Sequence, residues 1–142
     1  MILVGAGSPD SIKRLSEIAH PITREGRIVV AGFGNVGNKL VEMLNDAEEE
    51  VFVIDQNVNP HVDLVGDVLD TNVLGQADLT TARVIIIAGE NDSATLPAAS
   101  VVRDYAPDVP ILACAALEEN VGHILQAGAN FALSVSQVAG SS

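Results

Sequence analysis

The sequence predicts an α/β fold built as a doubly wound parallel sheet. Segments that are apolar throughout alternate along the chain with segments whose apolar residues recur at helical spacing. Strands without polar alternation are typical of parallel sheets that helices cover on both faces. A glycine-rich turn also stands between the first strand of this series and its first helix. Together these features indicate a Rossmann-type sheet with the strand order 3-2-1-4-5-6.

The chain has 142 residues, which is enough for one full domain. We expect residues 1–26 to form an appendage, with a short strand at 1–5, a helix at 11–19 and a linker at 20–26. A strand that opens at the first residue suggests a fragment of a longer protein, and a natural start with a small appendage is the alternative. Residues 27–142 are expected to form the domain itself.

The first half of this domain alternates regularly between strands and helices. The strand at 27–31 holds a β-branched run, and the helix at 35–45 has its apolar residues on one face. A second buried strand covers 51–54. A weaker strand at 62–65 then leads into a short helix at 73–79.

The strongest strand of the sequence follows at 83–88, where three isoleucines stand in a row. The next helix covers 92–105, with Asp92 or Ser93 available as its N-cap. Pro97 must then lie in or near the first turns of that helix, because proline in a helix interior removes a hydrogen bond.

The last strand–helix–strand unit begins with a strand at 111–114. A helix at 118–127 follows, and Gly128 is placed to end it. Its inward residues are expected to be Val121, Ile124 and Leu125. A final strand covers 131–133.

The turn at 32–37 carries most of the functional information. Its sequence, Gly32-Phe33-Gly34-Asn35-Val36-Gly37, matches G-x-G-x-x-G directly after a strand and directly before a helix. The first glycine permits the tight turn, the second lets a pyrophosphate approach the backbone, and the third lets helix and strand pack closely. The N–H groups near Asn35 and Val36 would then point at the phosphate. A glycine-rich turn that only packs tightly is the alternative.

Asp55 is the second part of this signature, at the end of the second strand and 18 residues after Gly37. A carboxylate there can accept hydrogen bonds from both ribose hydroxyls and would repel a 2′-phosphate. Gln56 and Asn57 follow, and neither is basic. NAD(H), or an adenine nucleotide with a free ribose such as ATP, ADP or AMP, is therefore favoured over NADP(H). A solvated aspartate at a strand end is the alternative.

Two further strand ends are expected at the same edge of the sheet. Gly66, Asp67 and Val68 follow the third strand, and the predicted fold places them beside the adenine. Ala88, Gly89 and Glu90 end the fourth strand, next to the point where the strand order reverses and ligands bind. In both places a turn that merely caps the next helix is the alternative.

The charge balance excludes several classes of partner. Nineteen acidic residues against seven basic ones give a net charge of -12, which argues against nucleic acid and against anionic lipid. No apolar run is long enough to span a bilayer, so we expect no membrane insertion of this chain. Few lysines and many carboxylates suit a cytoplasm of high salt concentration, and an ordinary acidic surface is the alternative.

No group suited to catalysis stands out. His20, His61 and His123 are each expected away from the ligand edge, as solvated or structural side chains. Cys114 lies inside an apolar strand and is expected to be buried and inert. No pair of His or Cys has metal-ligand spacing. We therefore expect no catalytic residue, no metal site and no enzymatic activity.

These residues resemble the nucleotide-binding lobe of the RCK (regulator of potassium conductance) family, also called TrkA-N domains. The resemblance covers about Arg27 to Gly140. It rests on the glycine motif and Asp55, and on four further segments: Gly66-Asp67-Val68-Leu69-Asp70, which is similar to the family's G-D-A-T-D; the helix from Val73-Leu74 to Ala77; Gly89-Glu90-Asn91-Asp92; and Ala127-Gly128-Ala129-Asn130. The first 20 residues are similar to the end of a preceding RCK C-terminal lobe.

The resemblance implies a cytoplasmic regulatory module that binds NAD(H) or ATP/ADP and gates ion flux by rearrangement of a dimer. Its partners would be a second copy in a homodimer or higher RCK assembly, and the membrane subunit of a potassium channel or transporter. The chain departs from the family at Cys114 and Ala115, where a basic residue often closes the fifth strand, and at Ser134 to Ser136, where a proline is frequent. The alternative function is the cofactor-binding domain of an NAD-dependent oxidoreductase.

Overall fold

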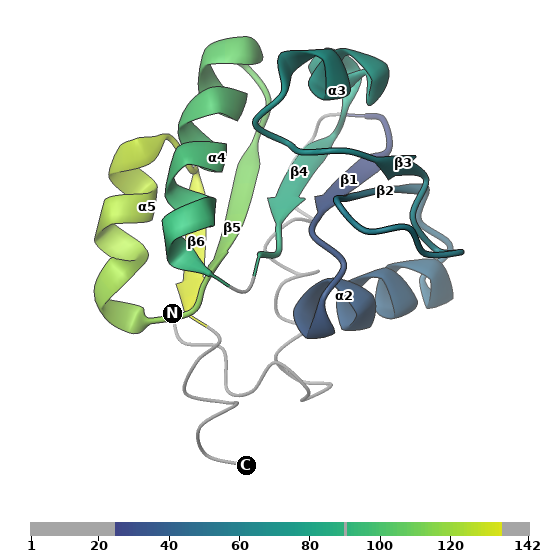
Figure 1. Cartoon of the computed structure of the whole chain (residues 1–142), viewed down its shortest axis with the longest axis horizontal. Helices are drawn as coiled ribbons and strands as arrows, with labels where there is room; N and C mark the ends of the chain where they lie inside the picture. The colour runs from purple at the N-terminus through teal and green to yellow at the C-terminus, as the bar shows by residue number, and fades with distance from the viewer. Residues whose placement is uncertain (1–24, 90, 135–142) are drawn as a thin grey trace.

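The structure is a computed structural model that describes residues 25–89 and 91–134. The strand and helix expected within residues 1–19, and Glu90, lie outside the described residues. The described chain forms a six-stranded, wholly parallel sheet in the order β3-β2-β1-β4-β5-β6, which confirms the predicted order (Figure 1). The strands are β1 (Ile28–Ala31), β2 (Val51–Asp55), β3 (Leu64–Val65), β4 (Val84–Ile87), β5 (Ile111–Ala115) and β6 (Phe131–Ser134).

Helices cover both faces of the sheet, as the uniformly apolar strands require. The helices are α2 (Asn35–Asp46), α3 (Thr71–Gln76), α4 (Asp92–Tyr105) and α5 (Val121–Ala127), with 3-10 turns η1 (Leu79–Thr81) and η2 (Glu118–Asn120). One apolar cluster joins α3, α4 and α5 to alternate strand residues such as Val29, Ile85 and Ile111. A second cluster joins α2 to the opposite strand residues, among them Val30 and Ile86. Figure 1 shows α2 on the other side of the sheet from α4 and α5.

Two elements near β3 differ from the prediction. The third strand is only Leu64–Val65, not 62–65, because the Val62 N–H bonds within a turn to Asn59, and the Val53 N–H of β2 donates to the side chain of Asp63 and not to its backbone. The helix expected at 73–79 is α3, which begins after Asp70 because that side chain accepts a hydrogen bond from the Asn72 N–H at 2.9 Å. It ends before Asp78, whose φ of 55° interrupts the helical backbone.

The later helices also carry corrections. The N-cap of α4 is Asn91, not Asp92 or Ser93, and its side chain accepts from the Ser93 N–H at 3.0 Å. Helix α5 is shorter than predicted, because η2 precedes it. It ends at Gly128 as predicted, with a φ of 135°. Leu125 was expected to face inward but is 42% exposed, since a helix of two turns buries only the narrow stripe around Ile124.

At the amino edge of the sheet, where the strands begin, Arg103 links several elements by hydrogen bonds. Arg103, in the last turn of α4, donates to the carbonyl oxygens of Gly128, Pro107 and Val109 at 2.8–3.0 Å. It also donates to the Asn130 side chain just before β6. These bonds satisfy carbonyl groups at the end of α4 and at the turn before β6, so α4, α5 and β6 are held together at this edge.

Candidate functional site

The turn between β1 and α2 is tight because its backbone leaves no room for side chains at Gly32 and Gly37. Gly32 has a φ of 103°, in the left-handed region where side chains are disfavoured, and its N–H donates to the Ile54 carbonyl at 2.8 Å. A Cβ added at Gly37 would lie only 2.0 Å from the Gly32 carbonyl oxygen. The start of α2 therefore lies directly against this turn, as the third glycine of the motif was predicted to allow.

Helix α2 begins after a glycine that makes no side-chain cap hydrogen bond. Its N-cap is Gly34, no side chain caps the helix, and its first turn contains no acidic residue. The first N–H groups of a helix have no partner within the helix and carry a partial positive charge. A glycine cap leaves space in front of them for an external acceptor.

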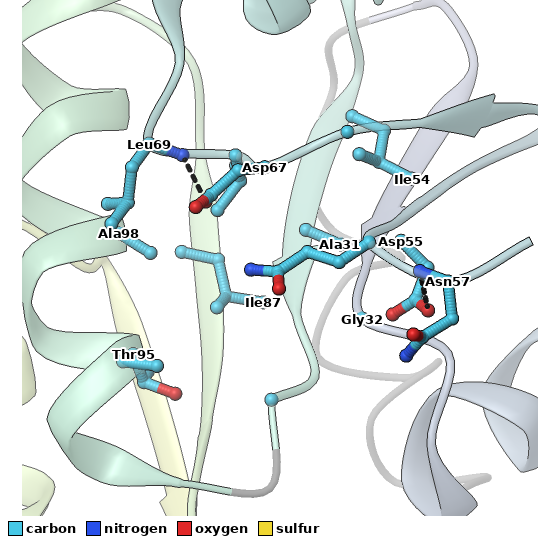
Figure 2. A pocket seen from close by; sticks show the side chains of 15 residues that line it. Ala31, Gly32, Ile54, Asp55, Asn57, Asp67, Leu69, Ile87, Thr95 and Ala98 are labelled. Atoms are coloured by element: carbon cyan, nitrogen blue, oxygen red, sulfur yellow. Dashed lines mark hydrogen bonds between the residues drawn. The ribbon is translucent and has the colours of Figure 1, made fainter.

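Asp55 lies against this turn, at the end of β2. Its Oδ1 accepts a hydrogen bond from the Phe33 N–H at 3.0 Å, and its Oδ2 accepts from the Asn57 N–H at 3.0 Å (Figure 2). The carboxylate is thereby oriented by two backbone donors from two different loops. The glycine-rich turn and the strand-end acid, 22 residues apart in sequence, are brought into direct contact.

A cavity of about 220 Å³ opens beside these groups, at the carboxyl ends of β1, β2 and β4. Figure 2 shows the side chains that line it. Seven of the predicted site residues are among them: Gly32, Asp55, Gln56, Gly66, Asp67, Val68 and Gly89. This is the point at which the strand order reverses, where ligands bind in open α/β sheets.

The other predicted residues do not line the cavity. Val36, Gly37 and Ala88 are buried in the packing between α2 and the sheet. Phe33 and Gly34 lie in the turn in front of α2 and Asn35 is its first residue, so these three could meet only a ligand that extends beyond the cavity. Glu90 lies outside the described residues.

Sequence reasoning missed a wall of the cavity contributed by α4 and by residues next to the predicted ones. Thr95, Ala94 and Ala98 belong to α4, and Thr95 Oγ1 would be only 3.1 Å from a Cβ at Gly89. Small residues on a helix face signal close packing as readily as a binding surface, so no pattern distinguished them. The remaining lining residues are Ala31, Ile54, Asn57, Leu69 and Ile87.

Asp67 and Asp92 have structural partners of their own. Asp67 Oδ1 accepts from the Leu69 N–H at 2.9 Å in a turn after β3, so it does not cap α3. The buried carboxylate of Asp92 accepts from the N–H groups of Ala116 and Leu117 at 2.6 and 3.0 Å. It also accepts from the Asn120 side chain at 2.7 Å, which ties the start of α4 to the turn after β5.

One histidine lies closer to the site than the sequence suggested. His61, in the loop between β2 and β3, stacks on Phe33 of the glycine-rich turn with ring centroids 5.9 Å apart. The expectation that it lies away from the ligand edge was therefore wrong, because the loop after β2 folds back over the turn. Its side chain does not line the cavity. His123 is exposed on α5.

Cys114 is buried within β5, as predicted. Burial raises the pKa of its thiol from about 9 to about 12, because the thiolate would be removed from water. Within residues 25–89 and 91–134, no group of three or more His, Cys, Asp or Glu side chains could hold a metal ion. No helix in the same part of the chain has the length and apolar character to cross a bilayer.

The fold and the cavity define a Rossmann-type α/β domain with a ligand-sized site at its topological switch point. Residues 28–135 match the model of the TrkA-N domain. The chain belongs to the TrkA-N domain family, as its resemblance implied.

Solved structures of one protein, the GsuK channel, are similar to this chain. The structure described as the GsuK channel bound to NAD is 28% identical, with a TM-score of 0.74 over 82% of this chain and 22% of that one. GsuK bound to ADP is 26% identical, with a TM-score of 0.77 over 92% of this chain and 36% of that one. The NAD(P)-binding domain of an exopolyphosphatase-related protein from Archaeoglobus fulgidus shares the fold, at 21% identity and a TM-score of 0.72 over 82% of this chain and 93% of that one.

An uncharacterized protein from Methanothermus fervidus is 28% identical in a match of 116 residues, and the match covers 75% of this chain and 18% of that protein. The chain thus spans about a fifth of the length of this relative and of the GsuK channel.

Proposed function

We propose that this chain is the nucleotide-binding part of a cytoplasmic regulatory domain that controls a potassium channel or potassium transport system. The cavity at the carboxyl edge of the sheet would hold NAD(H), or an adenine nucleotide such as ATP, ADP or AMP. Binding would shift a homodimer or a larger assembly of such domains between two arrangements, and the membrane subunit would respond. Membership of the TrkA-N family and the likeness to GsuK structures support this proposal.

The observation that carries the proposal is the contact between Asp55 and the glycine-rich turn, at the rim of the cavity. A dinucleotide needs an acceptor for its ribose hydroxyls about one strand away from the donors for its diphosphate. Asp55 supplies the acceptor, and the glycine-capped start of α2 supplies the donors. Apolar lining residues such as Ile54, Val68 and Leu69 provide a surface for the adenine ring.

Each part of the nucleotide would meet particular residues of this chain. The ribose would displace the Phe33 or Asn57 N–H from Asp55, or share the carboxylate with them, because each carboxylate oxygen can accept two hydrogen bonds. The diphosphate would lie in front of α2, where Gly34 presents no side chain. Asp67 and Gly66 would border the adenosine from the turn after β3.

We further propose that the chain acts by binding and not by catalysis. A regulatory ligand does its work through a difference in affinity between two conformations, so the site needs no acid, base or nucleophile. The raised pKa of the Cys114 thiol, and its burial within β5, keep that side chain from serving as a nucleophile. The cofactor-binding domain of an oxidoreductase would need a catalytic group from outside the described residues.

Titration calorimetry with NAD⁺, NADH, ADP, ATP and NADPH tests the proposal. We expect binding of the ligands with a free ribose and weaker binding of NADPH, because Asp55 would face its 2′-phosphate. Asp55→Ala should lower the affinity by about 10- to 100-fold, the equivalent of losing charge-assisted hydrogen bonds. Asp104→Asn, an exposed change near the far end of α4, is the matched control and should bind as the unmodified chain does.

The regulatory part of the proposal needs a second measurement. Sedimentation velocity with and without NAD⁺ should reveal a dimer whose shape or stability depends on the nucleotide. A chain that binds no nucleotide, or in which Asp55→Ala has no effect, would contradict the site. A chain that binds a nucleotide as an unchanging monomer would contradict the mechanism and leave the site intact.

A further inference from the structure

The charges around the cavity bear on which nucleotide it takes. Two carboxylates, Asp55 and Asp67, are among its 15 lining residues, and none of those residues is Lys, Arg or His. Asp67 has its Oδ1 fixed by the Leu69 N–H. Figure 2 shows Asp67 on the β3 side of the cavity and Asp55 on the side of the glycine-rich turn. A ligand in the cavity therefore lies between two negative side chains.

The arginines of the described chain lie at the opposite edge of the sheet, and each is engaged there. Arg27 precedes β1 and lies 4.0 Å from the centroid of the Phe52 ring. Arg83 precedes β4 and pairs with Glu49 at 2.9 Å. Arg103, at the end of α4, is surrounded by the carbonyl groups described above. Since parallel strands all begin at the same edge, these cations are a full strand length away from the cavity.

Within residues 25–89 and 91–134, the groups left to hold the diphosphate are then mainly the backbone N–H groups at the start of α2. These donors offer partial charges only, roughly half an elementary charge for a whole helix end. The chain as a whole carries a net charge of -12, so its long-range field also opposes an anion. Lys39 lies on α2 but does not line the cavity.

From this charge distribution we infer that the cavity selects nucleotides by low net charge, with NAD⁺ preferred over NADH, and NADH over ADP and ATP. The inference rests on the proposed function and specifies its ligand. NAD⁺ has the smallest negative charge of the four because its nicotinamide ring is cationic, and the charge grows through NADH and ADP to ATP. At separations of a few ångströms, each additional negative charge lowers the affinity by about fivefold.

Ionic strength gives the inference a second, independent signature. Where a site attracts an anion through basic side chains, added salt weakens binding, because screening reduces the attraction. Here the interaction between the ligand and the two carboxylates is repulsive, so screening should strengthen the binding of ADP. NAD⁺ should respond less, since it carries less charge.

The experiment is titration calorimetry of the whole chain with NAD⁺, NADH and ADP at about 0.05 M and about 1 M KCl, a range over which the screening length falls several-fold. At low salt we expect NAD⁺ to bind at least about 10-fold more tightly than ADP. Added salt should reduce this difference in affinity. Asp67→Asn keeps the side-chain oxygen that accepts from Leu69 and removes the charge. It should raise the affinity for ADP about fivefold and change that for NAD⁺ less. Asp104→Asn removes a charge far from the cavity and should change neither.

The outcomes separate the two levels of the proposal. If ADP binds as tightly as NAD⁺ at low salt, or if added salt weakens ADP, the charge selection is wrong and the nucleotide site stands. The charge selection is also wrong if the Asp67→Asn variant has the same ratio of affinities for NAD⁺ and ADP as the unmodified chain. If none of the nucleotides binds at either salt concentration, the proposed function fails and this inference fails with it.

Discussion

The contact between Gly37 and Gly32 allows a sharp prediction for the substitution Gly37→Ala. The added Cβ would lie 2.0 Å from the Gly32 carbonyl oxygen and 2.9 Å from its carbon. Non-bonded heavy atoms are at their optimum at about 3.5 Å or more, so α2 must move away from the turn by roughly 1 Å. Both colliding atoms belong to the backbone, and no side chain can rotate to relieve the overlap.

The cost follows from what this movement disturbs. Residues such as Val36 and Leu40 pack α2 onto the sheet and would lose part of their contact. Overpacking of this kind costs about 1–3 kcal/mol, and a rigid backbone obstacle places Gly37→Ala at the upper end. Alanine has a higher helix propensity than glycine, which offsets this loss of stability by up to about 1 kcal/mol. The net loss should be about 2 kcal/mol, which lowers Tm by roughly 5–10 °C in a domain of this size.

Thermal unfolding followed by circular dichroism measures this shift, and Gly122→Ala is its control. Gly122 lies in α5, and a Cβ added there would meet nothing within 4 Å. That variant should be as stable as the unmodified chain or more stable by up to about 1 kcal/mol. If Gly37→Ala melts at or above the temperature of the unmodified chain, the close packing of α2 on the turn is not as described.

Two further predictions concern buried groups. Asp92→Ala leaves the Ala116 and Leu117 N–H groups without their acceptor and should cost about 3–4 kcal/mol in urea unfolding, whereas Asp92→Asn, which keeps an acceptor oxygen, should cost clearly less. Equal losses for the two variants would argue against the hydrogen bonds as the cause. Cys114 should resist iodoacetamide in the folded chain and react once urea unfolds it. Folding raises the pKa of this thiol, so its contribution to the free energy of unfolding should be constant below about pH 9. Between about pH 9 and about pH 12 that free energy should fall by about 1.4 kcal/mol per pH unit. The Cys114→Ala variant should lack this part of the pH dependence.

Much of the fold could be predicted because its signals are local. Uniformly apolar strands and helical periodicity alternate in the sequence, and the predicted strand order is the one typical of a Rossmann-type doubly wound sheet. The glycine-rich turn and Asp55 could be predicted for the same reason, since strand ends fix their places. The end of α5 at Gly128 is a further local signal that the structure confirms.

What escaped prediction depends on contacts distant in sequence. The cavity wall formed by Thr95 and Ala98 exists because the first turns of α4 lie beside the carboxyl ends of the strands, and nothing in the local pattern of α4 indicates it. His61 reached Phe33 through a loop whose path is set by tertiary packing. Leu125 has helical spacing but too short a helix to bury it.

Two of the helices that begin at the carboxyl edge, α2 and α4, have different residues at their N-termini. At the start of α4 the side chain of Asn91 already occupies the leading amide, and the carboxylate of Asp92 adds a full negative charge there. At the start of α2 the N-cap is Gly34, which has no side-chain oxygen and no charge. We therefore expect an anionic group of a ligand to bind at the N-terminus of α2 and not at that of α4, which would fix the direction in which a bound nucleotide lies.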